Sequence, residues 1–251
     1  MTAASGSELR IFADAHGLYR AVAAELVACA ARAMDARGRF TIALAGGSTP
    51  RPLYELLASP EFSGQLDWTR TEVFFGDERC VPPDDRRSNF RMAADALLAH
   101  VPLPADRIHR IYGEEDPAFA ALHYVQELQA AFRCVEAPRF DLILLGVGEN
   151  GHTASLFPGS AALRESVRLV VPQYVESRQE WRITLTLPLL NAAAAVWVLA
   201  QGAAKAGVLQ RVLEGPFLPE VLPAQGLAPA HGPLVWWLDR TAATALKHPP
   251  S

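Results

Sequence analysis

Short apolar runs that end in glycine and polar residues recur along the chain. The runs Phe40–Ala45, Glu72–Phe75 and Asp141–Leu145 each break into a glycine-containing loop, and helical stretches at Ser88–His100 and Pro117–Arg133 lie between them. Nearly continuous apolar strands that alternate with helices indicate a buried, mostly parallel sheet. Ligands of such sheets bind beyond the carboxyl ends of the strands, so we expect the polar loops to open on one edge.

The flanking patterns predict where the first helices begin and end. Roughly Ala13–Arg37 is rich in alanine and carries apolar residues at three-to-four spacing, as an amphipathic helix does, and Gly38 ends it. Pro50–Ala58 is predicted to be a second helix, with Thr49 as its N-cap and proline at its first position. With Phe40–Ala45, this segment forms a strand, a glycine turn and a helix.

The C-terminal half continues the alternation of strands and helices. The remaining predicted elements are strands at Arg182–Leu187, Ala195–Ala200 and Leu234–Leu238, a helix at Ala203–Leu213 and a short helix from Asp239. The segment Pro216–Pro233 is rich in proline and glycine and is interpreted as a loop excursion rather than a linker. No repeat of fixed period is present, and we expect residues 1–251 to form a single domain.

Composition and net charge limit the classes of molecule that the chain is expected to bind. Half of the 251 residues are apolar and a fifth are charged, so the chain can bury a sizeable core. Its net charge of −4 and the lack of a Lys/Arg run provide no basic surface for nucleic acid or an anionic membrane. An anionic ligand must therefore be held by a local site.

The cysteines and the apolar runs bear on the compartment. Cys29, Cys80 and Cys134 are far apart and lack C-x-x-C spacing, so neither a disulfide framework nor a zinc site is expected. The segment Met1–Arg10 has no apolar core, and the longest apolar run, Ala192–Ala200, is far shorter than the roughly 20 residues of a membrane span. We expect a cytoplasmic protein without a signal peptide.

The first polar loop, Gly46-Gly47-Ser48-Thr49, is a candidate anion site. Two glycines let the backbone approach a ligand closely, and the following helix offers unpaired N–H groups. The alternative is a tight strand-to-helix turn with an ordinary threonine cap, because the loop matches neither a Walker loop nor a G-x-G-x-x-G fingerprint.

The second loop places Asp77, Glu78 and Arg79 at the end of a predicted strand. Arginine recognises phosphate or carboxylate through two parallel hydrogen bonds, and a carboxylate there can take or orient a proton. A solvated charged turn is the alternative. Cys80 follows, but no motif supplies it with a base, so we interpret it as structural.

The third loop contains His152 after three glycines and beside Glu149, Thr153 and Ser155. A lone histidine is more often structural, but here its neighbours can orient the imidazole, and we expect it to titrate near neutral pH as a functional base. Ser155 lies in T-A-S-L-F rather than in a G-x-S-x-G elbow, which argues against an acyl-enzyme serine. The seven histidines show no metal-ligand spacing, so no metal is implied.

These loops together resemble the signature blocks of the 6-phosphogluconolactonase family. The matching blocks are LAGGSTPRPLYELLA, FFGDERCVPPDDRRSNFRMA and LLGVGENGHTASLFPGS, with RITLTLPLLNAA, the Gly202–Ala206 turn, LPAQ and W-x-x-D later in the chain. The resemblance covers the chain essentially end to end. It implies a doubly wound α/β fold with helices on both faces of the sheet, similar to glucosamine-6-phosphate deaminases and ribose-5-phosphate isomerases.

The resemblance also implies an activity and the residues that perform it. The implied reaction is hydrolysis of 6-phosphoglucono-1,5-lactone in the oxidative pentose phosphate pathway, without a cofactor, by a monomer or weak homo-oligomer. His152 matches the family's catalytic histidine. The other matching residues are Asp77, Glu78 and Arg79 in the second active-site loop, Gly46, Gly47, Ser48 and Thr49 in the phosphate-side loop, and Arg182, Lys205 and Gly151 as further substrate contacts.

The chain departs from the family's pattern beside His152, and two other functions are alternatives to lactone hydrolysis. Asn150 stands where the family commonly has aspartate, so no carboxylate can polarise His152 from that position, and Arg51 stands where lysine is frequent. An amino-sugar-phosphate deaminase or isomerase is the nearest alternative enzyme, with Asp77 as the base at the sugar C2. A non-catalytic sugar-phosphate sensor is the other alternative, but such a sensor needs a DNA-reading module, and neither the N-terminal segment nor the net charge indicates one.

Overall fold

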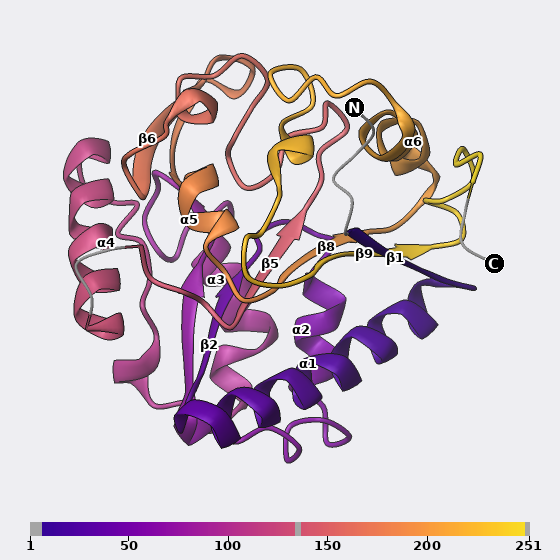
Figure 1. The fold of residues 1–251 in the computed structure, drawn as a ribbon. Helices are drawn as coiled ribbons and strands as arrows, with labels where there is room; N and C mark the ends of the chain where they lie inside the picture. The colour runs from indigo at the N-terminus through magenta and orange to yellow at the C-terminus, as the bar shows by residue number, and fades with distance from the viewer. Residues whose placement is uncertain (1–6, 134–136, 249–251) are drawn as a thin grey trace.

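A six-stranded sheet runs through the centre of the molecule in the computed structural model, which describes residues 7–133 and 137–248. All neighbouring strands pair in parallel, in the order β1-β9-β8-β5-β2-β3 (Figure 1). The strands are β1 (Ser7–Phe12), β2 (Phe40–Leu44), β3 (Thr71–Phe75), β5 (Leu142–Gly146), β8 (Val196–Ala200) and β9 (Leu234–Asp239). The parallel sheet predicted from the apolar runs is confirmed.

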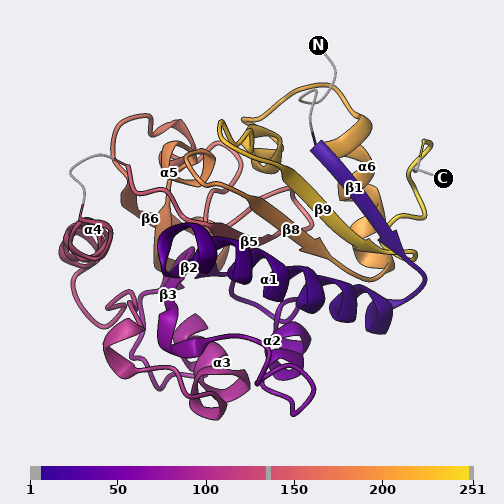
Figure 2. The ribbon, with the colours of Figure 1, turned by 60° about the horizontal axis from the view of Figure 1, so that its bottom comes forward.

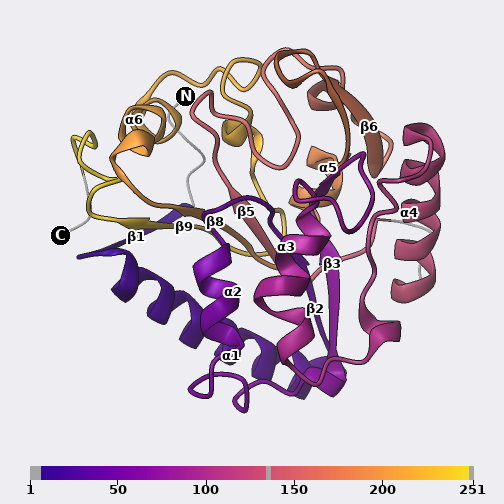
Figure 3. The ribbon, with the colours of Figure 1, turned by 180° about the vertical axis from the view of Figure 1, so that it is seen from behind.

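Helices cover both faces of this sheet. They are α1 (Ala15–Arg37), α2 (Arg51–Leu57), α3 (Asn89–Ala96), α4 (Pro117–Phe132), α5 (Leu187–Asn191) and α6 (Ala206–Glu214). Figure 2 shows α1, α2 and α3 on one face and α5 and α6 on the other, and the view from behind in Figure 3 turns α2 and α3 toward the reader. Because both faces are covered, β2, β3 and β8 are buried at every position, which confirms the doubly wound arrangement.

A second, antiparallel sheet joins the charged segment after β3 to a distant part of the chain. It consists of β4 (Asp77–Arg79), β7 (Glu180–Leu185) and β6 (Val170–Val175), in the order β4-β7-β6. Asp77 pairs with Thr184, and Arg79 pairs with Arg182. The charged residues were expected to form a loop, but they form a strand because β7 supplies the hydrogen-bonding partners.

Several predicted boundaries are wrong in detail. Thr49 does not cap α2, because Pro50 occupies the N-cap position and no side chain caps the helix. The predicted helix Ser88–His100 is α3 followed by a separate 3₁₀ turn at Leu98–His100. The short helix expected after β9 is a series of turns over residues 240–245.

Three elements escaped prediction because they are short or lack a continuous apolar run. β1 is an edge strand that is only half-buried and carries Glu8 and Arg10 between its apolar residues. β6 is the edge of the small sheet and contains Pro172, a residue that edge strands tolerate. α5 is a single short turn that directly follows β7.

The expectations about a membrane span, the N-terminal segment and the cysteines can be compared with the structure only for the residues that it describes. No helix within residues 7–133 and 137–248 is long and apolar enough to cross a membrane. The expectations for residues 1–6 of the N-terminal segment and for Cys134 lie outside the described residues.

A buried hydrogen-bond cluster joins α1, β2 and β5 at the edge of the sheet opposite the polar loops. Asp141 Oδ2 accepts hydrogen bonds from the backbone N–H of Thr41 at 2.8 Å and from its hydroxyl at 2.9 Å. The Thr41 hydroxyl in turn accepts from the Asp141 N–H at 3.0 Å, and Arg37 at the end of α1 forms an ion pair with Asp141. One carboxylate therefore holds three elements of the core together.

Replacing Asp141 with alanine should lower the free energy of unfolding by about 2–3 kcal/mol, because the Thr41 N–H and hydroxyl would be buried without an acceptor. Asp141→Asn should cost less, since its amide oxygen can still accept from one of these donors. Urea denaturation followed by circular dichroism measures both changes. A loss below about 0.5 kcal/mol in Asp141→Ala would show that the cluster contributes little to stability.

Candidate active site

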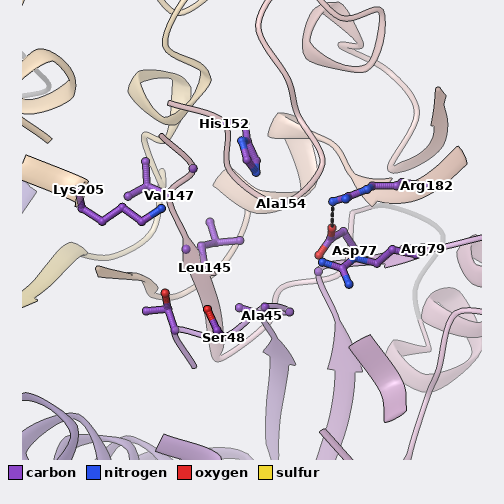
Figure 4. A pocket seen from close by; sticks show the side chains of 16 residues that line it. Ala45, Ser48, Asp77, Arg79, Leu145, Val147, His152, Ala154, Arg182 and Lys205 are labelled. Atoms are coloured by element: carbon purple, nitrogen blue, oxygen red, sulfur yellow. Dashed lines mark ion pairs between the residues drawn. The ribbon is translucent and has the colours of Figure 1, made fainter. Parts of the chain in front are cut away.

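The predicted polar loops meet around one cavity of about 210 Å³ at the carboxyl ends of β2, β3 and β5. Figure 4 shows Lys205 on one side of the cavity and Asp77, Arg79 and Arg182 on the other, with His152 between them. The predicted site residues that line it are Gly46, Gly47, Ser48, Thr49, Asp77, Arg79, His152, Arg182 and Lys205. Glu78 and Gly151, which the structure also describes, lie outside the lining.

The first loop approaches the cavity through two glycines with different constraints. Gly47 has φ +88°, a left-handed conformation that favours glycine. At Gly46, a Cβ atom would lie 2.0 Å from Oδ1 of Asn89, so only glycine leaves room for that buried amide. The hydroxyl of Tyr19 donates to the Thr49 carbonyl, which fixes the end of the loop.

The carboxylate of Asp77 is held by side chains from two other segments. Its Oδ2 accepts a hydrogen bond from the Ser155 hydroxyl at 2.6 Å, and its Oδ1 accepts from Asn89 Nδ2 at 3.1 Å. Nη1 of Arg182 lies 3.9 Å from Oδ2. Asp77 is buried, and each of its carboxylate oxygens has a donor, so its orientation is fixed.

Glu78 is directed away from the cavity and holds the start of α3. Its carboxylate accepts from the backbone N–H groups of Asn89 and Phe90, both at 2.7 Å, and from the Ser88 hydroxyl at 2.9 Å. Burial raises the pKa of Glu78, although these hydrogen bonds oppose the shift. This geometry gives Glu78 a positioning role, because it places Asn89 between Gly46 and Asp77.

His152 is oriented by its own loop. Nδ1 of the imidazole lies 2.6 Å from Asn150 Oδ1, and the backbone N–H of His152 donates to the same oxygen at 3.2 Å. Since Asn150 Oδ1 is the acceptor, Nδ1 carries the proton and Nε2 keeps a free lone pair. The amide of Asn150 therefore orients His152, although, as expected from the sequence, no carboxylate polarises the ring from position 150.

The environment of His152 favours the neutral imidazole. Burial lowers its pKa to about 4; the nearby charge of Asp77 opposes this shift, and the charges of Arg182 and Lys205 add to it. The expectation that His152 titrates near neutral pH is therefore wrong. Near pH 7 the ring is a neutral proton acceptor.

Two glycines shape the histidine loop. A Cβ atom on Gly148 would lie 2.0 Å from Nδ1 and Cε1 of His152, so the imidazole can pack against the backbone only because this residue is glycine. Gly151 has φ +81°, and a Cβ atom there would lie 2.7 Å from the side chain of Leu222. These contacts assign Gly151 to the turn that presents His152.

The cationic residues of the cavity differ in the hydrogen bonds and ion pairs that they already form with the protein. Arg182 forms an ion pair with Glu180 and lies near Ser155 and Asp77. Nη1 of Arg79 donates to the Arg87 carbonyl, while its buried Nε has no hydrogen-bond partner among the described residues. No ion pair with Lys205 occurs within residues 7–133 and 137–248, so its ammonium is the cation most available to a ligand.

Asn89 and the positioning role of Ser155 were missed in the sequence. Asn89 lies within the block FFGDERCVPPDDRRSNFRMA and directly after Ser88, which caps α3 by accepting from the Arg91 N–H at 3.1 Å. Ser155 was considered as a nucleophile and as a neighbour that can orient His152, whereas its hydroxyl donates to Asp77.

Neither described cysteine is suited to nucleophilic chemistry. Burial raises the pKa of the Cys80 thiol to about 12 and that of Cys29 to about 11, so both remain thiols near neutral pH. Among the described residues, no group of three His, Cys, Asp or Glu side chains is arranged to hold a metal ion.

Comparison with known proteins identifies the family. The chain is 41% identical over 217 residues to a 6-phosphogluconolactonase from Nostoc sp., covering 85% of this chain and 88% of that protein. It is 38% identical over 247 residues to a 6-phosphogluconolactonase from Mycobacterium tuberculosis, covering 96% and 98%. The solved structure of the Trypanosoma brucei 6-phosphogluconolactonase superposes with a TM-score of 0.81 at 27% identity, covering 96% of this chain and 98% of that chain.

The model of a family described as glucosamine-6-phosphate isomerases/6-phosphogluconolactonase matches residues 13–236. This match runs from α1 into β9, so it leaves out β1, and it includes all three loops around the cavity. The chain therefore belongs to the glucosamine-6-phosphate isomerase/6-phosphogluconolactonase family.

Proposed function

We propose that the chain hydrolyses 6-phospho-D-glucono-1,5-lactone to 6-phospho-D-gluconate, the second step of the oxidative pentose phosphate pathway. The observation that carries the proposal is a neutral imidazole at His152, with Nε2 unprotonated, in a cavity that Arg79, Arg182 and Lys205 make cationic. The names of the relatives support the same reaction. A lactone that carries a phosphate fits both features, because its phosphate is an anion for the cationic residues and its ester is a neutral group for the neutral imidazole.

The phosphate is held at the Lys205 side of the cavity. The ammonium of Lys205 provides a point charge there, and the loop Gly46–Thr49 lets backbone groups approach a phosphate oxygen closely. Holding the phosphate fixes the distance to C1 of the ring, so the reacting carbon lies near His152. Binding energy from a remote group thereby positions the reaction.

The hydrolysis requires one proton to move twice. His152 Nε2 accepts a proton from water as the water oxygen bonds to C1. The bond between C1 and the ring oxygen then breaks, and the imidazolium returns its proton to that oxygen, which becomes the C5 hydroxyl. The new carboxylic acid ionises at neutral pH and releases one proton to solvent.

The charged neighbours stabilise the two ions that form transiently. Asp77 is fixed as a carboxylate acceptor, and its negative charge stabilises the imidazolium of His152. Arg79 lines the cavity and supplies positive charge for the oxyanion that develops at C1. We assign Arg182 to holding Asp77 and Ser155 and to adding positive charge for the phosphate.

The alternative functions fit this geometry less well. A deaminase or isomerase needs a carboxylate base at the sugar C2, but both oxygens of Asp77 already accept hydrogen bonds from Ser155 and Asn89, so this carboxylate is engaged by the protein itself. A sugar-phosphate sensor needs no base of lowered pKa. We propose further that residues 1–251 act as a single domain, in the cytoplasm, as a monomer or weak homo-oligomer, without nucleic acid or membrane partners.

Acid release from freshly prepared lactone, followed in a pH-stat, tests the proposal. The purified protein should accelerate the release far above the spontaneous rate, with one proton per lactone consumed. A rate equal to the spontaneous rate would favour the sensor. Ammonia release from glucosamine 6-phosphate would favour the deaminase.

The His152→Ala variant should lose at least about 10²-fold in kcat, the scale expected for a positioned general base, with an unchanged circular dichroism spectrum. His16→Ala, an exposed histidine near the start of α1, is the matched control and should keep full activity. Near-normal turnover in His152→Ala would mean that another group accepts the proton.

Restoring a carboxylate with Asn150→Asp should raise the pKa of His152, because a negative charge beside Nδ1 favours the imidazolium. The acid limb of kcat/KM should therefore move to higher pH from its low position in the unmodified protein. The pH profile of kcat/KM measures the shift. An acid limb that stays in place or moves to lower pH would show that position 150 does not sense the base.

Removing the ammonium with Lys205→Ala should lower kcat/KM for the phosphorylated lactone by about 10- to 100-fold, as expected for a lost charge-assisted hydrogen bond. Hydrolysis of unphosphorylated gluconolactone should barely change. Lys247→Ala, which removes an exposed lysine near the C-terminus, is the matched control. An equal loss on both lactones would rule out phosphate recognition by Lys205.

A further inference from the structure

The aromatic ring of Phe157 lies against the imidazole of His152. The two ring centroids are 4.3 Å apart and the planes are inclined by only 19°, so the rings are stacked. Phe157 does not itself line the cavity, although the structure describes it fully. Its ring therefore covers one face of the imidazole without competing for the space of a ligand.

The backbone of the same loop is folded so that Phe157 returns to His152. Ala154 has φ +45°, a left-handed conformation that is uncommon for alanine. The turn is closed by a hydrogen bond of 2.9 Å from the Leu156 N–H to the Thr153 carbonyl, and Leu156 is fully buried. The strained turn reverses the chain between the two rings and makes the stack a built feature of the site.

Other contacts cover further parts of the imidazole of His152, which is half-buried. Gly148 packs against Nδ1 and Cε1, and Asn150 Oδ1 accepts the Nδ1 proton at 2.6 Å. With Phe157 on one face, the free lone pair of Nε2 is the part of the ring that remains for a reacting proton. Figure 4 shows the ring directed into the cavity.

We infer that Phe157 is a positioning residue that keeps His152 neutral and correctly oriented to accept a proton. The inference rests on the proposed function for its catalytic meaning, but the protonation state of His152 can be measured without a substrate. Stacking removes water from one face of the imidazole, and loss of hydration disfavours the charged form of the ring.

An aromatic ring can also stabilise a cation, an effect opposite in direction to the loss of hydration. A cation over a phenyl face gains about 0.5–2 kcal/mol, which would favour the imidazolium. In this site, however, the Arg182 guanidinium already lies over the Phe157 ring, with Cζ 5.6 Å from the centroid. The ring already faces one cation, and Arg182 repels a second, so the loss of hydration dominates.

The charges that face His152 come from four elements, and one of them, the Arg182 guanidinium, also contacts the Phe157 ring. Asp77 on β4 favours the imidazolium, whereas Arg182 on β7, Lys205 in the turn before α6 and Arg178 in the turn before β7 disfavour it. Together with burial, they leave the pKa of His152 at about 4. Changing residue 157 therefore tests the stacked ring together with its contact to Arg182, and Phe157→Tyr keeps both.

The experiment is a titration of the His152 ring by ¹H–¹³C NMR, with its signal assigned by its loss in His152→Ala. In Phe157→Ala the midpoint should rise by at least about one pH unit, toward the usual histidine value of about 6.5. Phe157→Leu should rise less, because leucine still excludes water. Phe157→Tyr should titrate like the unmodified protein, since the aromatic stack is kept.

The activity profile provides the second measurement. If the midpoint moves from about 4 to about 6, the neutral fraction of His152 at pH 5 falls about tenfold, and kcat/KM at pH 5 relative to pH 8 should fall by the same factor in Phe157→Ala. A purely structural role would lower activity equally at both pH values.

An unchanged midpoint in Phe157→Ala, within about 0.3 pH units, would overturn the inference, as would an equal rise in Phe157→Tyr. If Phe157→Ala does not fold, Phe157→Leu and Phe157→Met decide by the same criterion. Failure of the proposed function is distinguishable, because it would appear as missing lactone hydrolysis in the unmodified protein while the NMR midpoints still shift.

Discussion

The arrangement of the site depends on the hydrogen bonds of one buried carboxylate, that of Asp77. Asn89 reaches it from the start of α3 and simultaneously packs against Gly46, while Ser155 reaches it from the histidine loop. Three segments that are distant in sequence are thereby tied to β4. Because a buried carboxylate without donors is costly, each donor holds Asp77 in place and is itself held by it.

The hydrogen bonds of Asp77 also give Asp77 and His152 different roles. Asp77 is engaged on both oxygens and acts through its charge, whereas His152 keeps the free lone pair of Nε2 for a proton. The chain has only two lysines and an overall negative charge, yet Lys205 lines this cavity. The positive potential that an anionic substrate requires is therefore local to the cavity and not a property of the whole surface.

Most features that depend on local patterns could be predicted from the sequence. Continuous apolar runs are easily recognised because both faces of the sheet are buried, and parallel strands bring their carboxyl ends to one edge. The features that escaped prediction depend on contacts between residues far apart along the chain. The segment Asp77–Arg79 becomes a strand only because it pairs with β7, and Asn89 acquires its role only when α3 lies beside Gly46.

The expectation of a near-neutral pKa for His152 is wrong for the same reason, because the pKa depends on residues far apart along the chain. The lowered pKa also bears on the mechanism. A pattern of neighbours in sequence suggested an imidazole that titrates near neutral pH, but burial and two cations from other loops favour the neutral ring. A base of low pKa accepts a proton less readily from water, but its imidazolium is a stronger acid toward the departing ring oxygen. In the proposed mechanism, this stronger acid favours protonation of the ring oxygen as the lactone opens. The amide at Asn150 orients His152 without adding a negative charge, and it therefore preserves this balance.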